Sequence, residues 1–526
     1  MCARDFQFHG HQGGRHSRVD VSHDDDAVRF QLGERALTIG AIFVKLGLAP
    51  TTRTNRIGAH ARPNLGATQK LSAGGGAVLA AIIARKSMNN VLPLLLVTTL
   101  GAALVAACSK GFSRQERKWV TATFGMHVVF ACVQVPLTLA FYGSSDMFLY
   151  FSYGEILAQM MERDPGRVLP EVIALLLRQP HHLPLTIIGS GTSTGSMSAL
   201  AAASFYFLGP SKYATCVAFA LLSLCGKIGI YRVFRANVGP ERRFSAAVAT
   251  LFIPSFVFWS SGLIKEAVAV AGFGWALYGA HLWIVEARPA PGWALMLMGA
   301  IPIWLIKPYI LFPLLLAGGT WYYWARSLKR GRVRVRPLYV LGAGLLSVGG
   351  IVVLGQYFPE YAPEAFSAHA YELQQIGSRT RGGSNFALGG EMPTSLAGQF
   401  VFAPAALLTS LFRPAIFEVH NLLMLANALE TTAFTLLFAR VLLTRNLGAV
   451  RRQIMADPFF VFCVVFVITF GIAAGLASTN LGTLSRYRCP ILPFFVMLLF
   501  VLQKPRRATV RAPSVGGDTR GVLRAA

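Results

Sequence analysis

Arg486, Tyr487 and Arg488 stand directly before a C-terminal apolar segment, in the stretch Arg486-Tyr-Arg-Cys-Pro-Ile-Leu-Pro493. Arginine is costly near hydrocarbon unless an anion pairs with it. Its planar guanidinium presents paired donors that match a phosphate or a carboxylate. We therefore expect these arginines to hold the phosphate of a lipid, or of an anionic substrate, at the membrane surface.

Two carboxylates could supply the acid or base of such a site. Asp146 follows an apolar segment that ends near Tyr142, and Glu266 follows an aromatic segment together with Lys265. A carboxylate just outside hydrocarbon is partly desolvated, which raises its pKa towards the range useful in a general base. Simpler interpretations stay open, because Asp146 could cap a helix behind two serines and Lys265–Glu266 could be an ion pair that anchors a helix end.

A third group of cations lies in a long loop, in the sequence Arg379-Thr-Arg381-Gly-Gly-Ser384. A glycine-rich loop with arginines can cradle a phosphate or a sugar acid, but it can equally be a flexible, solvated loop. Lys307-Pro308-Tyr309 interrupts two apolar runs. It predicts a tight turn whose lysine reaches towards the membrane interface, rather than a ligand site.

Metal and nucleotide chemistry find no support in the sequence. The seven cysteines are scattered without a CxxC pair, and His181-His182 lacks partner ligands at metal spacing. No P-loop, dinucleotide-binding glycine fingerprint, HExxH or supported GxSxG motif is present. We predict no metal site from these patterns, while the need for a divalent metal ion as a cofactor stays open.

The composition places these residues on a membrane scaffold. Of the 526 residues, 54% are hydrophobic and only 14% are charged, whereas a soluble domain carries about 25% charge. The net charge of +26 comes from short basic clusters between apolar runs, which is the positive-inside pattern and not a nucleic-acid footprint. The lipid bilayer is therefore the expected partner, and nucleic acid is not.

Apolar runs recur from Val91 to Leu502. Many approach the ~20 residues that span a bilayer, and we predict an all-α, polytopic transmembrane helical bundle of about 11–13 spans. The candidate spans are 91–107, 119–142, 213–231, 244–260, 263–285, 293–306, 309–325, 338–354, 419–439, 458–477 and 489–503, and the segments 190–209 and 400–412 are short enough to be re-entrant.

Three regions emerge from this pattern. Residues 1–87 are rich in Arg, Gly, His and Asp, and we expect them to be disordered or to reflect a start codon assigned too far upstream, with Met88 as the alternative. Residues 88–503 form the membrane domain, with outer loops at 143–189 and 356–399, and residues 504–526 form a basic cytoplasmic tail. Irregular loops on one membrane face are where function concentrates.

The order of these motifs resembles the GT-C membrane glycosyltransferases, over roughly residues 119 to 500. An early span is followed by Asp146 and Tyr150, a later span closes with Tyr231-Arg-Val-Phe-Arg235, and Phe252-Ile-Pro-Ser-Phe-Val-Phe-Trp-Ser-Ser261 precedes Lys265-Glu266. The stretch from Ser485 to Pro493 stands near the end. The resemblance is to the bacterial branch that uses polyprenyl-phosphate-linked sugars to modify envelope glycans.

The resemblance implies a multi-pass protein of the bacterial inner membrane that moves a sugar from a polyprenyl-phosphate carrier to a glycan or lipid acceptor on the outer face. It implies that Asp146 and Glu266 are catalytic, with Asp146 the base. The residues that bind the substrate or the lipid phosphate would be Tyr150, Lys265, Arg379, Arg381, Arg486, Tyr487 and Arg488. The sequence departs from the family where Met147 follows Asp146 and where Lys265 precedes Glu266.

Two other functions stay open. An O-antigen-type polysaccharide polymerase also has about a dozen spans and outer arginines, and the loop with Arg379 and Arg381 would suit it. A transporter or lipid-linked glycan flippase would require internal repeats and charges near the bilayer midplane. The sequence shows neither feature clearly, which favours an enzyme.

Overall fold

The computed structural model describes residues 72–142, 145–331, 362–379, 384–389 and 391–503, with a few further positions between 349 and 359. The chain divides into two compact units, Met1–Ala77 and Val78–Ala526, and the second unit holds the predicted membrane domain. Its described residues are mainly helical and form no β-strand, and they contain one isolated bridge between Asn385 and Asn480.

The helices are, in chain order and with α for α-helices and η for 3-10 and π-helices: α2 Ser72–Cys108, α3 Arg114–Pro136, η1 Leu137–Tyr142, α4 Asp146–Arg163, α5 Pro165–Leu176, α6 Ser193–Leu208, α7 Lys212–Ala236, η2 Pro240–Arg242, α8 Arg243–Ala247, η3 Val248–Phe252, α9 Pro254–Trp259, α10 Lys265–Ile284, α11 Pro289–Ile306, η4 Pro308–Ile310, α12 Leu311–Lys329, α14 Pro363–Arg379, α15 Leu396–Gln399, η6 Phe400–Phe402, α16 Ala403–Phe412, η7 Ile416–Glu418, α17 Leu422–Thr444, α18 Leu447–Ala456, α19 Pro458–Leu476, α20 Leu481–Tyr487 and α21 Leu492–Leu502.

Seven helices of the described part are long and apolar enough to cross a membrane, or eight if the bent pair α20–α21 counts as one span. The prediction of an all-α, multi-pass membrane protein is confirmed. Among the described residues, fewer spans are found than the 11–13 predicted for the whole chain. Residues 1–71, most of the predicted span 338–354, Arg381 and the tail 504–526 lie outside the described residues.

The predicted span 244–260 is not one helix. It is divided into α8, the π-helix η3 and α9, because Ile253 adopts an extended conformation before Pro254. Proline removes a backbone donor and restricts the residue before it to extended conformations. The predicted span 309–325 forms α12, whose second half carries Tyr322, Arg326 and Lys329, so it is not among the apolar candidates.

The C-terminal span also differs from the prediction. The segment expected to cross the membrane at 489–503 is the second arm of a pair, since α20 and α21 meet at an angle of 76° across Arg488–Ile491. Pro490 at this break cannot donate the hydrogen bond that would continue α20. At the other end of the chain, α2 begins at Ser72, so part of the extension expected to be disordered is helical.

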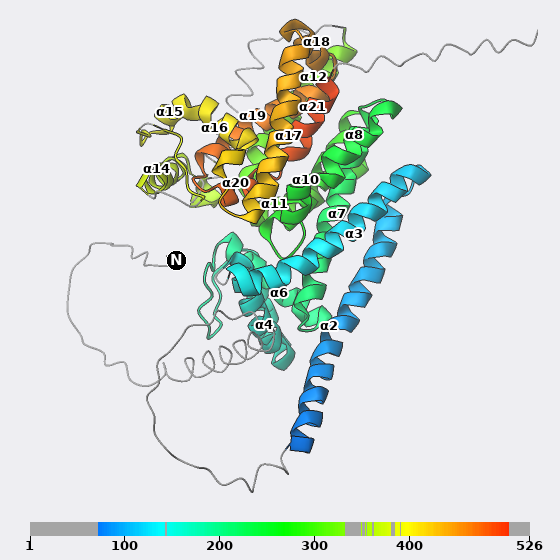
Figure 1. Ribbon diagram of the computed structural model, residues 1–526, viewed down its shortest axis with the longest axis vertical. Coiled ribbons are helices and arrows are strands. Elements are labelled where there is room, and N and C mark those ends of the chain that lie inside the picture. The colour runs from blue at the N-terminus through cyan, green and yellow to red at the C-terminus, as the bar shows by residue number, and fades with distance from the viewer. Residues whose placement is uncertain are drawn as a thin grey trace, which may run out of the picture. The chain divides into compact units, whose positions relative to one another are not determined.

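Helix α10 lies at the centre of one packed layer, between α7 and α11 (Figure 1). Glycines allow the backbones of α7 and α10 to approach closely, as small residues commonly do in membranes. A Cβ atom added to Gly274 of α10 would lie 1.9 Å from the carbonyl oxygen of Gly226 of α7. No rotamer change can relieve that clash, because the backbone alone fixes the positions of both atoms.

Replacing Gly274 with Ala is therefore expected to force α7 and α10 apart and to lower the free energy of unfolding by about 1–3 kcal/mol, the usual cost of overpacking. The measurement is thermal unfolding of the purified protein in detergent. Gly318→Ala in α12 is the control, because nothing lies within 4 Å of its added Cβ. Equal stability of Gly274→Ala and wild type would contradict the close approach.

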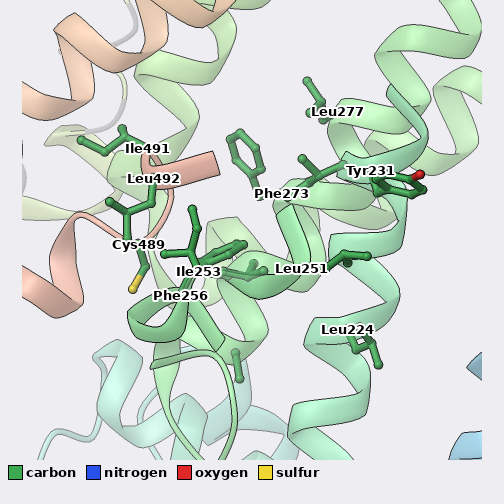
Figure 2. Packing of buried hydrophobic residues seen from close by; sticks show 14 of the residues in the cluster. Leu224, Tyr231, Leu251, Ile253, Phe256, Phe273, Leu277, Cys489, Ile491 and Leu492 are labelled. Atoms are coloured by element: carbon green, nitrogen blue, oxygen red, sulfur yellow. The ribbon is translucent and has the colours of Figure 1, made fainter. Parts of the chain in front are cut away.

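The two broken helices pack against each other in the core (Figure 2). Cys489, Ile491 and Leu492, at the bend between α20 and α21, are buried beside Ile253 and Phe256 from the η3–α9 break. Trp259 at the end of α9 donates a hydrogen bond to the hydroxyl of Ser485 at 3.2 Å. This contact fixes the last turn of α20 relative to the loop that leads into α10.

Candidate functional site

Asp146 is the first residue of α4, but it does not cap the helix. The cap is Ser145, whose hydroxyl accepts a hydrogen bond from the backbone N–H of Phe148. The carboxylate of Asp146 is therefore free to point elsewhere, and its side chain is 45% exposed. The capping interpretation, which the sequence left open, is not what the structure shows.

Arg486 of α20 joins the two predicted carboxylates. Its Nη2 donates to Oδ2 of Asp146 at 2.9 Å, and its Nε donates to Oε1 of Glu266 at 2.7 Å. These residues are 340 and 220 positions apart in the chain. The prediction that Asp146, Glu266 and Arg486 share one site therefore agrees with the geometry.

Glu266 is the most enclosed member of this cluster, with 1% of its surface exposed. Its Oε1 also accepts from Nζ of Lys307 at 2.6 Å, while Oε2 is buried without a hydrogen-bond partner among the described residues. Glu266 lies in the first turn of α10, where the positive end of the helix dipole favours a carboxylate. Two cations and the helix end therefore stabilise its charge.

Lys265 is a cation of the site that forms no ion pair in the described part of the chain. No carboxylate of the described residues lies within ion-pair distance of its Nζ. Its Nζ donates to the hydroxyl of Thr194 on α6 at 3.0 Å. The cluster thus combines Lys265, Lys307 and Arg486 with only Asp146 and Glu266, which leaves one surplus positive charge. A half-buried cation of this kind attracts an anion.

Three tyrosines surround the ionic cluster. Tyr150 is fully buried on α4, and its hydroxyl makes no hydrogen bond of good geometry in the described part, although Thr194 lies near. Burial, reinforced by Asp146, raises the pKa of Tyr150 well above its ordinary value. Lys307 Nζ lies 5.3 Å from the ring centre of Tyr487 and 5.9 Å from that of Tyr309. The three rings place polar, aromatic surface around the cluster, which suits a binding site.

Arg488 does not join this cluster, contrary to the prediction. Its side chain is fully buried and donates to the carbonyl oxygen of Arg413 at 2.7 Å and to Oδ1 of Asn427 at 2.6 Å. A carboxylate oxygen of Glu430 lies 3.8 Å away. Arg488 follows Arg486 by two positions at a helix end, so the two side chains leave in different directions, and Arg488 instead ties α20 to α17.

The arginine loop is only partly placed. Arg379 is exposed at the end of α14 and makes no ion pair with the carboxylates of the ionic cluster, while Arg381 lies outside the described residues. The segment that follows does reach the site region. Leu481 N–H donates to the carbonyl oxygen of Ser384, and Phe386 N–H donates to that of Thr479. The outer loop is thereby attached to the start of α20.

Sequence reasoning misses two members of the site. For Lys307 it predicts a snorkelling lysine at a turn, whereas the residue is 4% exposed and pairs with Glu266. A lysine flanked by apolar runs is a signal that could have identified it, since a buried cation needs a carboxylate. Thr194 carries no such signal, because hydroxyls are common at helix starts such as that of α6.

The arrangement offers a half-exposed carboxylate, an arginine between two carboxylates and a lysine that forms no ion pair with a carboxylate of the described residues. Such a site can take a proton from a substrate hydroxyl and stabilise a phosphate. The described residues include no group of three or more His, Cys, Asp or Glu side chains that could hold a metal ion. No family model matches the chain, and no curated protein and no solved structure is significantly similar to it.

Proposed function

We propose that the chain is a membrane glycosyltransferase, of the GT-C type that its motif order resembles. It would move a sugar from a polyprenyl-phosphate carrier to a glycan or lipid acceptor on the outer face of a bacterial inner membrane. The observation that carries the proposal is the contact of Arg486 with both Asp146 and Glu266 at the ends of helices. One site then contains a candidate base and a candidate phosphate ligand.

The proposed reaction needs one proton transfer and one leaving group. The acceptor hydroxyl attacks the anomeric carbon, its proton passes to Asp146, and the bond between that carbon and the phosphate oxygen breaks. Lys265 and Arg486 stabilise the phosphate that leaves. Because Arg486 holds Asp146 in the resting site, a bound phosphate would compete for the guanidinium and free the carboxylate to act as the base.

Replacing Lys265 tests its proposed role in binding the lipid-linked donor. Replacing it with Gln removes the surplus positive charge, so the KM for the lipid-linked donor is expected to rise about 10-fold to 100-fold, the value of one charged hydrogen bond. The kcat should also fall, because Lys265 is proposed to stabilise the phosphate as it leaves. Lys212→Gln is the control, because Lys212 pairs with Glu155 and not with the cluster. A KM unchanged by Lys265→Gln would remove this residue from the donor site.

The substrate class can be tested without knowing the sugar. Protein purified gently from its own cells is analysed by native mass spectrometry for retained phosphoryl lipids. The proposal predicts an isoprenoid phosphate or its glycosylated form on the wild type, and its loss from Arg486→Gln. Retention of ordinary phospholipids alone, in equal amounts by both proteins, would remove the support for a polyprenyl-phosphate donor.

A transporter or flippase is the second candidate, and one observation favours it. Lys227 lies inside the apolar helix α7 and is fully buried, with its Nζ donating to the carbonyl oxygen of Phe256 at 3.0 Å. An ionisable residue within a span beside a broken helix is typical of transport proteins. Movement of a lipid-linked glycan across a proteoliposome membrane by wild type but not by Lys227→Met, with no sugar transfer by either protein, would favour this candidate.

A further inference from the structure

A second polar pocket lies at the ends of α10 and α12 remote from the ionic cluster. Helix α10 carries Lys265 and Glu266 at its start and Trp283 and Ile284 at its end, 20 residues in all, and this length spans about 30 Å. Helix α12 follows Lys307 after the short helix η4, and its last turn also lines this pocket. The two sites therefore lie at opposite ends of the same helices.

The pocket has a volume of about 330 Å³ and an unusually basic lining. Its wall includes Trp283, Ala287, Tyr322, Arg326, Lys329 and Arg330. The three cations are exposed, and none forms an ion pair with a carboxylate of the described residues. A pocket lined by three such cations has a strong attraction for an anion.

The acidic residue that precedes Ala287 of the pocket rim is already engaged. Glu286, next to Ala287, lies 3.6 Å from the guanidinium of Arg288 and 3.5 Å from the imidazole of His281. It therefore cannot neutralise all three cations of α12. The last turn of α12 would favour some positive charge in any case, because it carries the negative end of the helix dipole. That effect explains cations at the helix end, but it does not explain a pocket between two helices.

The aromatic residues of the pocket are rigidly held. Trp283 stacks on Tyr322 with ring centres 5.0 Å apart, and it also contacts Trp293 at 4.9 Å. The guanidinium of Arg326 lies 4.9 Å above the ring of Tyr322, a cation–π contact that limits its motion. Tryptophan and tyrosine prefer the headgroup level of a bilayer, which is also where lipid phosphates are found.

The backbone of the pocket rim is strained. Ala287 adopts φ +55°, in the left-handed region that non-glycine residues rarely enter. Residues held in such conformations cluster at ligand sites, where the surrounding structure enforces them. Ala287 lies in the turn between α10 and α11 and lines the pocket together with the last turn of α12.

We infer that this pocket binds a phosphate-bearing anion, and that its occupant is the headgroup of an anionic phospholipid on the membrane face opposite the ionic cluster. Arg326, Lys329 and Arg330 would contact the phosphate, and Trp283 would pack against the glycerol backbone. The basic cluster that begins at Arg326 is predicted to face the cytoplasm, and the cytoplasmic leaflet is the one rich in anionic lipids. This inference does not depend on the proposed transferase activity.

The test compares lipid retention by the whole protein. Protein in mixed micelles with equal amounts of phosphatidylglycerol and phosphatidylcholine is analysed by native mass spectrometry. Wild type is expected to retain phosphatidylglycerol. In the variant Arg326→Gln, Lys329→Gln, Arg330→Gln (the α12 variant) retention is expected to fall at least about tenfold, the value of a single charged contact. The control, Arg440→Gln, Arg451→Gln, Arg452→Gln, removes the same charge from exposed positions of α17 and α18 and should retain the lipid.

A second arm identifies the source of the phosphate. Millimolar inorganic phosphate is added to protein in phosphatidylcholine alone, and the unfolding temperature is measured for wild type and for both triple variants. In one outcome, phosphate stabilises wild type and the control variant but not the α12 variant, while no protein retains phosphatidylglycerol. That result would assign the pocket to a soluble phosphate ligand instead of a lipid. Equal lipid retention by wild type and the α12 variant, together with no response to phosphate, would overturn the inference, as would equal loss in the control variant.

Discussion

Replacing Asp146 with Asn is expected to lower sugar transfer by about 10²–10⁴-fold, the usual contribution of a general base. Asn keeps the size of the side chain and can still accept a hydrogen bond from Arg486, so the helix start at Ser145 and the contact between α4 and α20 should persist. What is lost is the ability to take the acceptor proton. The expected result is a folded protein that binds the donor and does not transfer the sugar.

The matched control for this change is Glu155→Gln. Glu155 lies on the same helix, is similarly exposed and pairs with Lys212 at 3.0 Å, away from the ionic cluster. Transfer should be within about twofold of wild type, because an exposed ion pair contributes at most about 1 kcal/mol. If Asp146→Asn retains full transfer, Asp146 is not the base, and the arginine-based polymerase becomes the better explanation.

Replacing Glu266 with Gln is expected to destabilise the protein by about 3–5 kcal/mol, since it leaves buried cations without their counter-charge. Glu266 is 1% exposed and accepts from both Lys307 and Arg486. A neutral amide cannot offset the desolvation of two cations. The measurement is the free energy of unfolding in detergent, together with the amount of folded protein recovered from the membrane.

The double variant Glu266→Gln, Lys307→Met separates this electrostatic cause from a packing defect. Removing the second cation should restore a large part of the lost stability, because Arg486 keeps its contact with Asp146. Glu286→Gln is the control, as its carboxylate is 39% exposed and should cost less than about 1 kcal/mol. A double variant no more stable than Glu266→Gln would show that the charge of Lys307 is not the cause.

Much of the membrane fold was predictable from composition and hydropathy. Apolar runs bounded by basic clusters located the seven long spans, from α2 to α19, close to their observed ends. The broken elements were not predictable. The division of 244–260 at Ile253 and the bend at Pro490 depend on how two interrupted helices pack against each other. Hydropathy averages over such breaks, because both arms are equally apolar.

The candidate site was predictable where a charge stood at the edge of an apolar run. Asp146, Glu266 and Arg486 all stand at such edges and come together in the structure. The direction of a side chain at a helix end cannot be derived from spacing, which is why the prediction places Arg488 in the site although it is bound by Asn427. The GT-C resemblance stays a prediction, since no comparison tests it.

The most direct test of the central claim uses the envelope glycans and lipid-linked intermediates of a strain that lacks the gene, analysed by mass spectrometry. The strain is complemented with wild type, Asp146→Asn or Glu155→Gln at equal membrane levels. We predict that one sugar decoration disappears on deletion, returns with wild type and Glu155→Gln, and stays absent with Asp146→Asn. Single unpolymerised repeat units would indicate a polymerase instead, and a glycan profile that deletion leaves unchanged would contradict both sugar-handling functions.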